Sequence, residues 1–544
     1  MTTTHEVLNQ VPPLTGHDVA DVPVLLEGVA REGAGWALEP LREIGELAGR
    51  PETQELGRRA EAHPPVLRTH DRYGTRIDTV EYDPAYHALM TTAVERGLHA
   101  APWRDDRPGA HVARAASFLV WSQVDAGHGC PVSMTYAAVP ALRAAPELAA
   151  QYEPLLTSRV YEPGAHPPLD KAGLTAGMSM TEKQGGSDVR AGTTRAVVQP
   201  DGSYRLTGHK WFTSAPGSDL FLVLAQAPGG LTCFLLPRVL PDGTLNRMLL
   251  QRLKDKLGNR SNASSEVEYD EAVAHRVGDE GRGVKTIIEM VNTTRLDCVL
   301  GSAAGMLAGV AQATHHATHR AAFGRQLVDQ PLMRNVLADL AVEAEAAVTV
   351  AVRLAGATDR AARGDDGEAL LRRLALAATK YAVCKRGPGH AAEALECLGG
   401  NGYVEDSGLP RLYREAPLLS IWEGSGNVAA LDVLRAMATR PQSVEAFFGE
   451  VGLAAGGDAR LDRAVTRLKD DLVDVTTLEH RARSVVEQLA LVLQGALLVR
   501  HGHPAVADAF CASRLDGRHG QAYGTLPAGV DTAAILARAT PKVA

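Results

Sequence analysis

The chain has 544 residues, which is too long for one hydrophobic core and predicts three or four domains. Its net charge of −8 gives no overall reason to expect nucleic acid, and its 45% hydrophobic content is ordinary for a folded soluble protein. No apolar run reaches the roughly 18 residues that span a bilayer, and the amino terminus lacks the features of a secretion signal. The six cysteines include no CxxC pair, which favours reduced thiols in a cytoplasm over disulfides or zinc.

Residues 1–175 indicate an arm followed by a helical domain. Residues 1 to about 60 are rich in Pro, Gly and charge, which predicts an ordered arm rather than a compact unit. Two later stretches, 84–97 and 109–126, carry apolar residues at three- and four-residue spacing and predict helices. Another helix is expected to start near Ser133, after the breakers Gly127, Gly129 and Pro131.

The pattern changes to that of strands between residues 176 and 273. Residues 195–198 and 203–207 alternate on either side of Pro200-Asp201-Gly202, which predicts a hairpin. Residues 221–226, 231–236 and 264–269 are further strand-like runs. These residues predict a small β-domain between helical regions.

The helical pattern returns after residue 273 and continues to the end of the chain. Three long helices are expected at about 284–321, 331–363 and 368–398, packed antiparallel as a bundle within a domain at 274–440. Residues 441–544 are again helical in pattern and predict an extra domain. The predicted fold class is therefore α+β, with helical, β, helical and helical parts in that order.

The motifs of common nucleotide and metal sites are missing from the sequence. There is no strand–GxGxxG–helix pattern and no GxxxxGK[ST] loop, so neither a Rossmann nor a P-loop site is supported. His315 and His319 have the i, i+4 spacing of metal-binding helices, but the HExxH glutamate and a third ligand are lacking. We interpret them as part of a solvated or packed helix face and expect no metal.

The stretch 420–427, SIWEGSGN, places one carboxylate, Glu423, between an apolar pair and a glycine-rich turn that leads into a helix. Such an acid is most often a solvated or capping residue. It can also be a desolvated base, because burial disfavours the charged form and raises the pKa. The local sequence leaves both readings open.

Two further stretches combine groups that suit a ligand site. Residues 180–188, MTEKQGGSD, combine hydroxyls, an acid and two glycines that let backbone amides approach an anion. Residues 208–214, GHKWFTS, offer an aromatic pair followed by a hydroxyl. Taken singly, the first is more often an ordinary turn, and Trp211 is more often a core residue.

Five motifs in order resemble the acyl-CoA dehydrogenase superfamily of flavoproteins: TE…GGSD, GHKWFTS, RxxFG (320–324), LGGNGY (398–403) and IWEGSGN. The resemblance covers about 170–440. The amino-terminal arm, the run RLKDKLGNRSNAS (252–264) and the extra carboxy-terminal domain narrow it to a branch linked to the alkylation-damage response. It implies a cytoplasmic, FAD-dependent oxidoreductase that forms a homotetramer, a dimer of dimers.

The resemblance also implies which residues contact FAD. Residues 178–186 would supply backbone contacts, Thr181 would bind the pyrimidine edge, Trp211 would lie against the isoalloxazine, and Thr213 would lie near N5. The further FAD contacts that it implies are Met178, Met180, Gly186, Ser187, Trp422, Gly424, Ser425 and Asn427 in the same subunit, and Arg320, Phe323, Gly399 and Gly400 toward the FAD of a neighbouring subunit.

Glu423 matches the base of this family, which removes the α-proton of an acyl-CoA while hydride leaves the β-carbon for flavin N5. Some relatives, including isovaleryl-CoA dehydrogenases, carry the base on another helix, directly before an arginine. That position is Thr294 here, before Arg295, and threonine is no base. Glu423 is therefore the candidate that remains.

The substrate and a second function stay open. Lys183 and Gln184 enter a loop that normally lines the acyl-CoA entrance, and the branch implies weak, isovaleryl-like activity. Small nitro or alkylating compounds are an alternative, against which a glutamate base argues mildly. The other alternative is a protective protein that binds double-stranded DNA through Arg435 and Arg518, with a flavin site that is largely vestigial. Residues 441–544 hold 11 Lys/Arg and 12 Asp/Glu, which does not favour binding to phosphates.

Overall fold

The computed structural model describes residues 4–542 and divides into two compact units. The β unit comprises Gln54–Arg107 and Val124–Asp297. The helical unit comprises the described residues up to Thr53, together with Pro108–Gln123 and the residues from Cys298 onward. Each unit therefore combines segments that are distant in the sequence.

The β unit contains a seven-stranded sheet in the order β3-β5-β4-β6-β7-β9-β8. Its strands are β3 (Ala176–Ser179), β4 (Arg195–Val198), β5 (Tyr204–Ser214), β6 (Leu220–Ala227), β7 (Gly230–Pro237), β8 (Met248–Leu253) and β9 (Ser264–Val277). Additional pairings of β3 with β6 and of β5 with β9 close the sheet into a barrel-like ring. The expected central β-domain is thus confirmed, and β8 is a strand that the sequence pattern missed.

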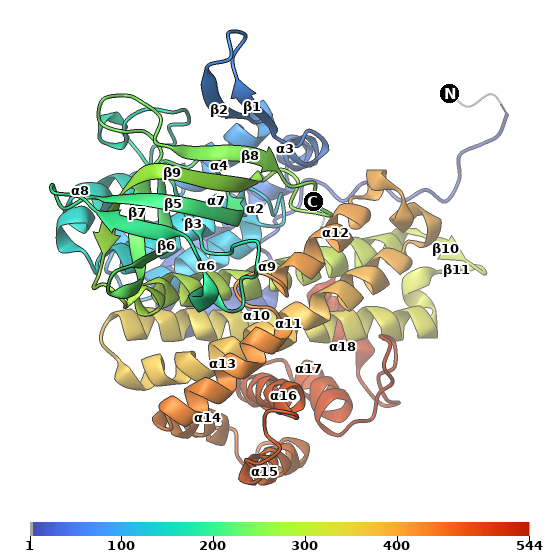
Figure 1. Cartoon of the computed structure of the whole chain (residues 1–544). Coiled ribbons are helices and arrows are strands. Elements are labelled where there is room, and N and C mark those ends of the chain that lie inside the picture. Colours follow the sequence, from blue (N-terminus) through green and yellow to red (C-terminus); the bar gives the residue numbers. More distant parts are fainter. Residues whose placement is uncertain (1–3, 543–544) are drawn as a thin grey trace. The chain divides into compact units, whose positions relative to one another are not determined.

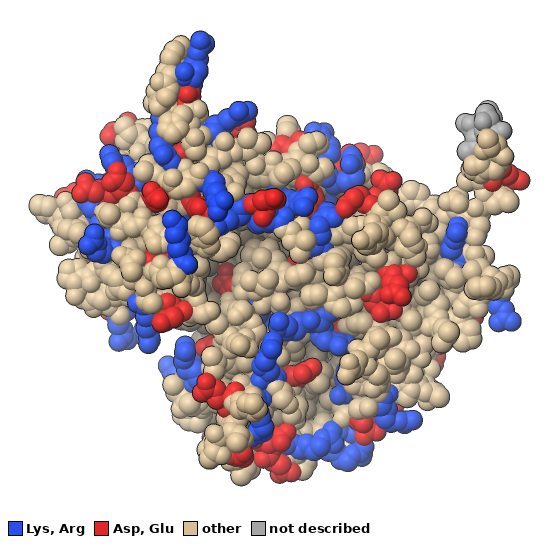
Figure 2. All heavy atoms as spheres, turned by 45° about the vertical axis from the view of Figure 1, so that its right-hand side comes forward, with Lys and Arg blue, Asp and Glu red and all other residues tan. Residues whose placement is uncertain are grey.

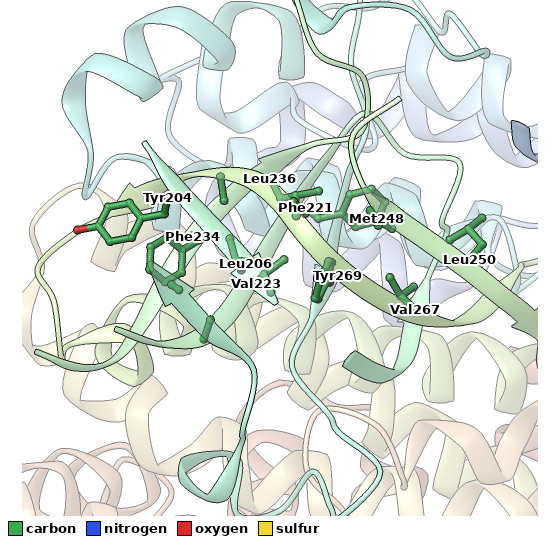
Figure 3. Close-up of a cluster of buried hydrophobic side chains, with 14 residues drawn as sticks. Tyr204, Leu206, Phe221, Val223, Phe234, Leu236, Met248, Leu250, Val267 and Tyr269 are labelled. Carbon is green, nitrogen blue, oxygen red and sulfur yellow. The ribbon is translucent and has the colours of Figure 1, made fainter. Parts of the chain in front are cut away.

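The interior of this sheet is filled by apolar and aromatic side chains from six of its strands (Figure 3). Phe221, Phe234 and Leu206 are fully buried, and the Tyr204 ring lies 4.9 Å from the Phe234 ring, centroid to centroid. Strand residues alternate between this interior and the outer face because successive side chains of a strand point to opposite sides. The alternation sets which motif residues face the core.

Helices and one hairpin complete the β unit. The helices are α4 (Pro84–Glu95), α5 (Ala101–Arg104), α7 (Gly129–Leu142) and α8 (Pro146–Leu156), and most of α3 (Pro51–Ala62) belongs here. Asp83 caps α4 by accepting a hydrogen bond from the Ala85 amide, 2.8 Å away. The sequence analysis missed the hairpin β1 (Val66–His70) and β2 (Arg76–Glu81), and α7 begins four residues before Ser133.

The helical unit is built on long helices, labelled in Figure 1, that match the three expected ones. They are α9 (Gly283–His319), whose first part belongs to the β unit, α10 (Pro331–Ala362) and α11 (Asp366–Glu396). Two shorter helices, α12 (Leu409–Leu419) and α13 (Gly426–Thr439), pack on α11. The sharp β10 (Ala321–Ala322) and β11 (Arg325–Gln326) hairpin follows α9.

The amino-terminal segment is more structured than an arm. It forms α1 (Pro23–Val29) and α2 (Leu38–Gly49), which pack on α10 and on α6 (Ala110–Trp121). Glu32, just after α1, is paired with Arg360 of α10 at 3.0 Å. The Pro and Gly residues that suggested an ordered arm rather than a compact unit mark the starts and turns of these helices.

The segment after residue 440 is helical, as expected, and its charged residues bind the rest of the helical unit. Its helices are α14 (Gln442–Gly452), α15 (Ala459–Val473), α16 (Ala482–His501), α17 (Pro504–Phe510) and α18 (Thr532–Ala539). Glu450 of α14 lies between Arg353 of α10 and Arg500 of α16, 2.8 Å from each. Hydrogen bonds from both arginines outweigh the effect of burial and lower the pKa of Glu450.

Two helices, α9 and α16, are long and apolar enough to cross a membrane by length and composition alone. However, 72% and 67% of their apolar stretches are buried inside the protein. This is the burial expected of core helices, which pass the same test. All six cysteines are buried, and none forms a disulfide within residues 4–542.

Candidate active site

Glu423 lies in a short loop of the helical unit, between the end of α12 and the start of α13. Its φ is +56°, and that of Gly424 is +103°, so two successive residues adopt the left-handed region. This conformation costs a residue with a side chain about 1–2 kcal/mol. Glu423 and Gly424 therefore separate α12 from α13, and Glu423 is half-buried.

Lys380 of α11 holds this loop from beneath. Its Nζ donates hydrogen bonds to the carbonyl oxygens of Trp422, at 2.8 Å, and Gly424, at 2.5 Å, which flank Glu423. Lys380 is only 1% exposed. Lys380 was not predicted from the sequence. The one sequence feature that could have indicated its role is its position as a single lysine in the apolar stretch LALAATKYAV.

The residues that follow Glu423 form the first turn of α13. Ser425 is the N-cap residue, yet its side chain makes no capping hydrogen bond. Ser425 and Asn427 are exposed, and Trp422 Nε1 is buried without a hydrogen-bond partner among residues 4–542. Unused amides, a hydroxyl and an indole N–H thus collect at this helix start, as a polar ligand would require.

A second group of predicted residues lines one cavity of the helical unit, of about 430 Å³. Arg320, Gly399 and Gly400 all contribute to its wall. Phe323 does not: it lies at the tip of the β10–β11 hairpin with φ +52° and is 98% exposed. The structure therefore brings three of these four residues together and directs Phe323 away from the protein surface.

In the β unit, the MTEKQGGSD loop is anchored by a buried ion pair. Glu182 and Lys210 are each 2% exposed, and Lys210 Nζ lies 2.8 Å from Glu182 Oε1. The same carboxylate accepts hydrogen bonds from the backbone amides of Thr193, at 2.7 Å, and Thr194, at 3.1 Å. Burial favours the neutral acid, but Lys210 and these donors outweigh it and hold the pKa of Glu182 well below its usual range.

Several residues before and after this anchored glutamate remain at least partly accessible to a ligand. Met178 and Met180 are half-buried on the same face of the chain, and Ser187 is exposed. A Cβ atom on Gly186 would lie 2.5 Å from Thr181 Oγ1, so glycine is needed for the loop to pass this hydroxyl. The Thr181 carbonyl accepts a hydrogen bond from the Trp211 amide at 2.8 Å, which links the loop to β5.

Trp211 and Thr213 of β5 have different surroundings. Lys254 Nζ lies 3.3 Å from the centroid of the Trp211 ring, so a cation covers one face of the indole. Thr213 is fully buried, and its hydroxyl shares a hydrogen bond with that of Ser179. Lys183 and Arg252 also lie over the Trp211 ring, 5.7 and 5.8 Å from its centroid. The Thr213 hydroxyl is instead buried in the sheet.

The structure also describes the residues considered as an alternative base, as metal ligands and as DNA contacts. Thr294 is buried in α9, and its hydroxyl donates to the carbonyls of Met290 and Val291, as in an ordinary helix. Nε2 of His315 lies 2.8 Å from the Pro12 carbonyl, and Nδ1 of His319 lies 2.9 Å from the carbonyl of His315. Arg435 and Arg518 are both exposed.

Each unit, taken by itself, offers groups that suit part of a flavin dinucleotide. In the helical unit, the cavity around Arg320, Gly399 and Gly400 offers a cation and a glycine turn, which suit an anionic phosphate group. In the β unit, the half-buried methionines and the Trp211 indole suit a flat, largely apolar ring. The unsatisfied Trp422 N–H and the uncapped start of α13 suit a polar chain.

Three family models match successive parts of the chain. Residues 9–163 match the adaptive response protein AidB N-terminal domain, 177–272 the acyl-CoA dehydrogenase middle domain, and 281–438 the acyl-CoA dehydrogenase C-terminal domain. The second match coincides with the seven-stranded sheet, and the third contains α9–α13 and Glu423.

Individual relatives match almost the whole chain. The putative acyl-CoA dehydrogenase AidB of Escherichia coli is 47% identical over 523 residues, 95% of each chain. The crystal structure of Caenorhabditis elegans ACDH-11 in complex with C11-CoA has a TM-score of 0.86 and 29% identity, and covers 95% of this chain and 94% of that one. An acyl-CoA dehydrogenase from Bacillus anthracis complexed with FAD shares the fold, with a TM-score of 0.64, 18% identity and coverage of 79% and 81%.

Proposed function

Because the chain belongs to the AidB branch of the acyl-CoA dehydrogenase family, we propose that it dehydrogenates an acyl-CoA with Glu423 as the base. The protein is an oxidoreductase, and FAD is its cofactor. When bound, FAD accepts a hydride. The contribution of the chain is to hold the thioester and remove its α-proton.

The observation that carries this proposal is the conformation of Glu423. A left-handed glutamate is strained, and such strain persists where the surrounding structure imposes it, commonly at active sites. The loop places this acid, half-buried, directly after the half-buried Trp422. Thr294, at the other known position of the base, is occupied by hydrogen bonds within its helix.

For the cofactor, we propose that Thr181 and Trp211 contact the ring, and that Arg320, Gly399 and Gly400 reach the FAD of a neighbouring subunit. Met178, Met180, Gly186, Ser187, Trp422, Gly424, Ser425 and Asn427 complete the proposed set. The half-buried Trp211 indole supports the ring contact. Thr213 has weaker support than the others, because its hydroxyl is already bonded to Ser179.

For the substrate, we propose an acyl-CoA thioester of the isovaleryl type or longer. The C. elegans relative is described with C11-CoA, which favours the class of thioesters over nitro or alkylating compounds. A carboxylate base suits the acidic α-carbon of a thioester. A role in the alkylation-damage response rests on the likeness to AidB alone.

The test is anaerobic reduction of the flavin by a panel of acyl-CoAs that includes isovaleryl-CoA and an undecanoyl-CoA. We expect Glu423→Gln to keep FAD bound while the rate of flavin bleaching falls at least about 10³-fold. Glu271→Gln is the matched control, because Glu271 shares the left-handed backbone, with φ +57°, but is exposed on β9. Bleaching by Glu423→Gln at the wild-type rate would exclude Glu423 as the base.

We also propose a homo-oligomer, and a tetramer in particular. Phe323, Leu332 and Tyr403 are 98%, 83% and 83% exposed, more than large apolar side chains usually are. A second copy of the chain would cover Phe323 beside its own cofactor site. We expect sedimentation to give a tetramer for the wild type and a smaller species for Phe323→Asp, whereas a wild-type monomer would contradict the proposal.

No described residue adds support for a DNA-binding role, which stays a hypothesis based on the resemblance. Acidic and basic side chains are mixed on the face that Figure 2 shows. Most of the cations after residue 440 are paired with acids, namely Arg460, Arg463, Arg481, Arg500, Arg514, Arg538 and Lys542. Arg435 and Arg518 alone make no phosphate-binding surface.

A further inference from the structure

Lys380 is a cation placed where a cation is costly. It lies on α11 between the buried residues Thr379 and Tyr381, and its own side chain is 1% exposed. Removing an ammonium group from water costs several kcal/mol unless hydrogen bonds or an opposite charge compensate. No carboxylate within residues 4–542 forms an ion pair with Lys380, so its compensation comes from elsewhere.

That compensation comes from the two peptide carbonyls on either side of Glu423. The Trp422 oxygen lies 2.8 Å from Nζ, as in charge-assisted hydrogen bonds, and the Gly424 oxygen lies closer still, at 2.5 Å. The ammonium therefore fixes the peptide group between Trp422 and Glu423 and the one between Gly424 and Ser425. These two peptide groups bound the pair of left-handed residues, so the lysine holds both ends of the short segment that directs the Glu423 side chain.

The loop needs such a support. Glu423 and Gly424 both have positive φ, and a free chain would relax the glutamate to an ordinary conformation. The middle of α13 is fixed separately, by Asp432, which is paired with Arg373 of α11 at 2.8 Å. Helix α11 thus holds α13 through one ion pair and holds the preceding loop through Lys380.

We propose that Lys380 is a positioning residue for the base: it holds the strained backbone of Glu423 so that the carboxylate meets the α-proton of the substrate. The inference rests on the proposed function, in which Glu423 is that base. Lys380 itself contacts neither substrate nor cofactor in this role. A misplacement of about 1 Å at a reacting group can cost about 10²-fold in rate, which is the scale of effect expected.

The first test uses Lys380→Met, which keeps the length of the side chain and removes both the charge and the donors. With isovaleryl-CoA as substrate, we expect the limiting rate of flavin reduction to fall about 10- to 100-fold. The half-saturating concentration should change less than about twofold, because binding of the thioester is untouched. A wild-type limiting rate would overturn the proposal.

Two variants support this measurement. Lys469→Met, in α15 of the helical unit, removes an exposed lysine that makes no hydrogen bond to the loop and should leave the rate unchanged. Lys380→Gln keeps amide donors but is shorter, so it covers the case in which the methionine variant does not fold. We expect its limiting rate to fall as well, and a wild-type rate for this variant would equally overturn the proposal.

The double variant Lys380→Met with Glu423→Gln separates positioning from a general structural role. If Lys380 acts through Glu423, its removal should change the residual rate of Glu423→Gln less than about twofold. A full further loss in that background would mean that Lys380 acts on something else. If Glu423→Gln alone bleaches normally, the proposed function fails, and that result is distinct from failure of the lysine proposal.

Hydrogen exchange gives a readout that does not depend on turnover. In the Lys380→Met holoprotein, amides of a peptide covering 419–427 should exchange faster, because the loop has lost the bonds that fix it. Peptides of the β unit that cover 180–194 should exchange as in the wild type. Unchanged exchange at 419–427 would show that the lysine does not hold the loop and would overturn the proposal.

Discussion

Two loops, one in each unit, are each held by a buried lysine, but at different atoms. In the MTEKQGGSD loop, Lys210 binds the carboxylate of Glu182 itself at 2.8 Å. In the IWEGSGN loop, Lys380 binds the backbone carbonyls on either side of Glu423. One lysine thus occupies the acid of its loop, whereas the other holds the backbone around the acid.

This difference separates a structural carboxylate from the one proposed as the base. Glu182 is surrounded by donors that stabilise its charged form, so it is a weak base and serves to tie the loop to Thr193 and Thr194. The loop of Glu423 is held through its main chain, because Lys380 binds the carbonyls of Trp422 and Gly424. Both loops carry the sequence pattern of an acid near glycines, and the position of the lysine is one difference between them.

The largest expected effect is the loss of stability against unfolding in Lys210→Met. The substitution leaves a buried carboxylate without its cation, which typically costs about 3–5 kcal/mol. Lys380→Met leaves two backbone carbonyls without their hydrogen-bond donor and should lower the free energy of unfolding by less, about 1–3 kcal/mol. In denaturant unfolding, Lys210→Met should therefore be the less stable of the two variants. In flavin reduction, Lys380→Met should have the lower rate per molecule of bound FAD.

The double variant Lys210→Met with Glu182→Gln is the control for that ranking. Removing the charge from both partners relieves the uncompensated carboxylate, so part of the lost stability should return. If the double variant is as unstable as the sum of the two single variants, the ion pair is not what anchors the loop.

Much of the fold could be predicted from the sequence because its patterns are local. Helices α9, α10 and α11 begin and end within a few residues of the expected positions, since glycine and proline breakers bound long apolar periods. The β1–β2 hairpin and the helices α1 and α2 were missed because short elements carry little period and many charges. The division into four domains at 175, 273 and 440 stays a prediction.

The site was predictable as far as its motifs reach, and no further. Glu423, Arg320 and the 399–400 turn stand in recognisable strings, and the structure places the last two in one cavity. The two lysines could not be found this way. Lys210 lies 28 residues from Glu182, and Lys380 lies 42 residues from Trp422, so each pairing exists only once the chain is folded.

The smallest expected effect, of about 1 kcal/mol, is the different response of the two loops to pH. The pKa of Glu182 is lowered in the folded protein from the ordinary value of 4.5, so its anchor contributes stability that is present above pH 4.5 and is lost as the pH falls. Between pH 4.5 and 3.5, opening of the loop at 180–194 should become about 1 kcal/mol easier. The carbonyl acceptors of Lys380 do not titrate in this range, so its hold on 419–427 should persist. Hydrogen exchange corrected for intrinsic rates measures both loops in one experiment, and equal loss of protection in the two would show that both anchors depend on a titrating acid.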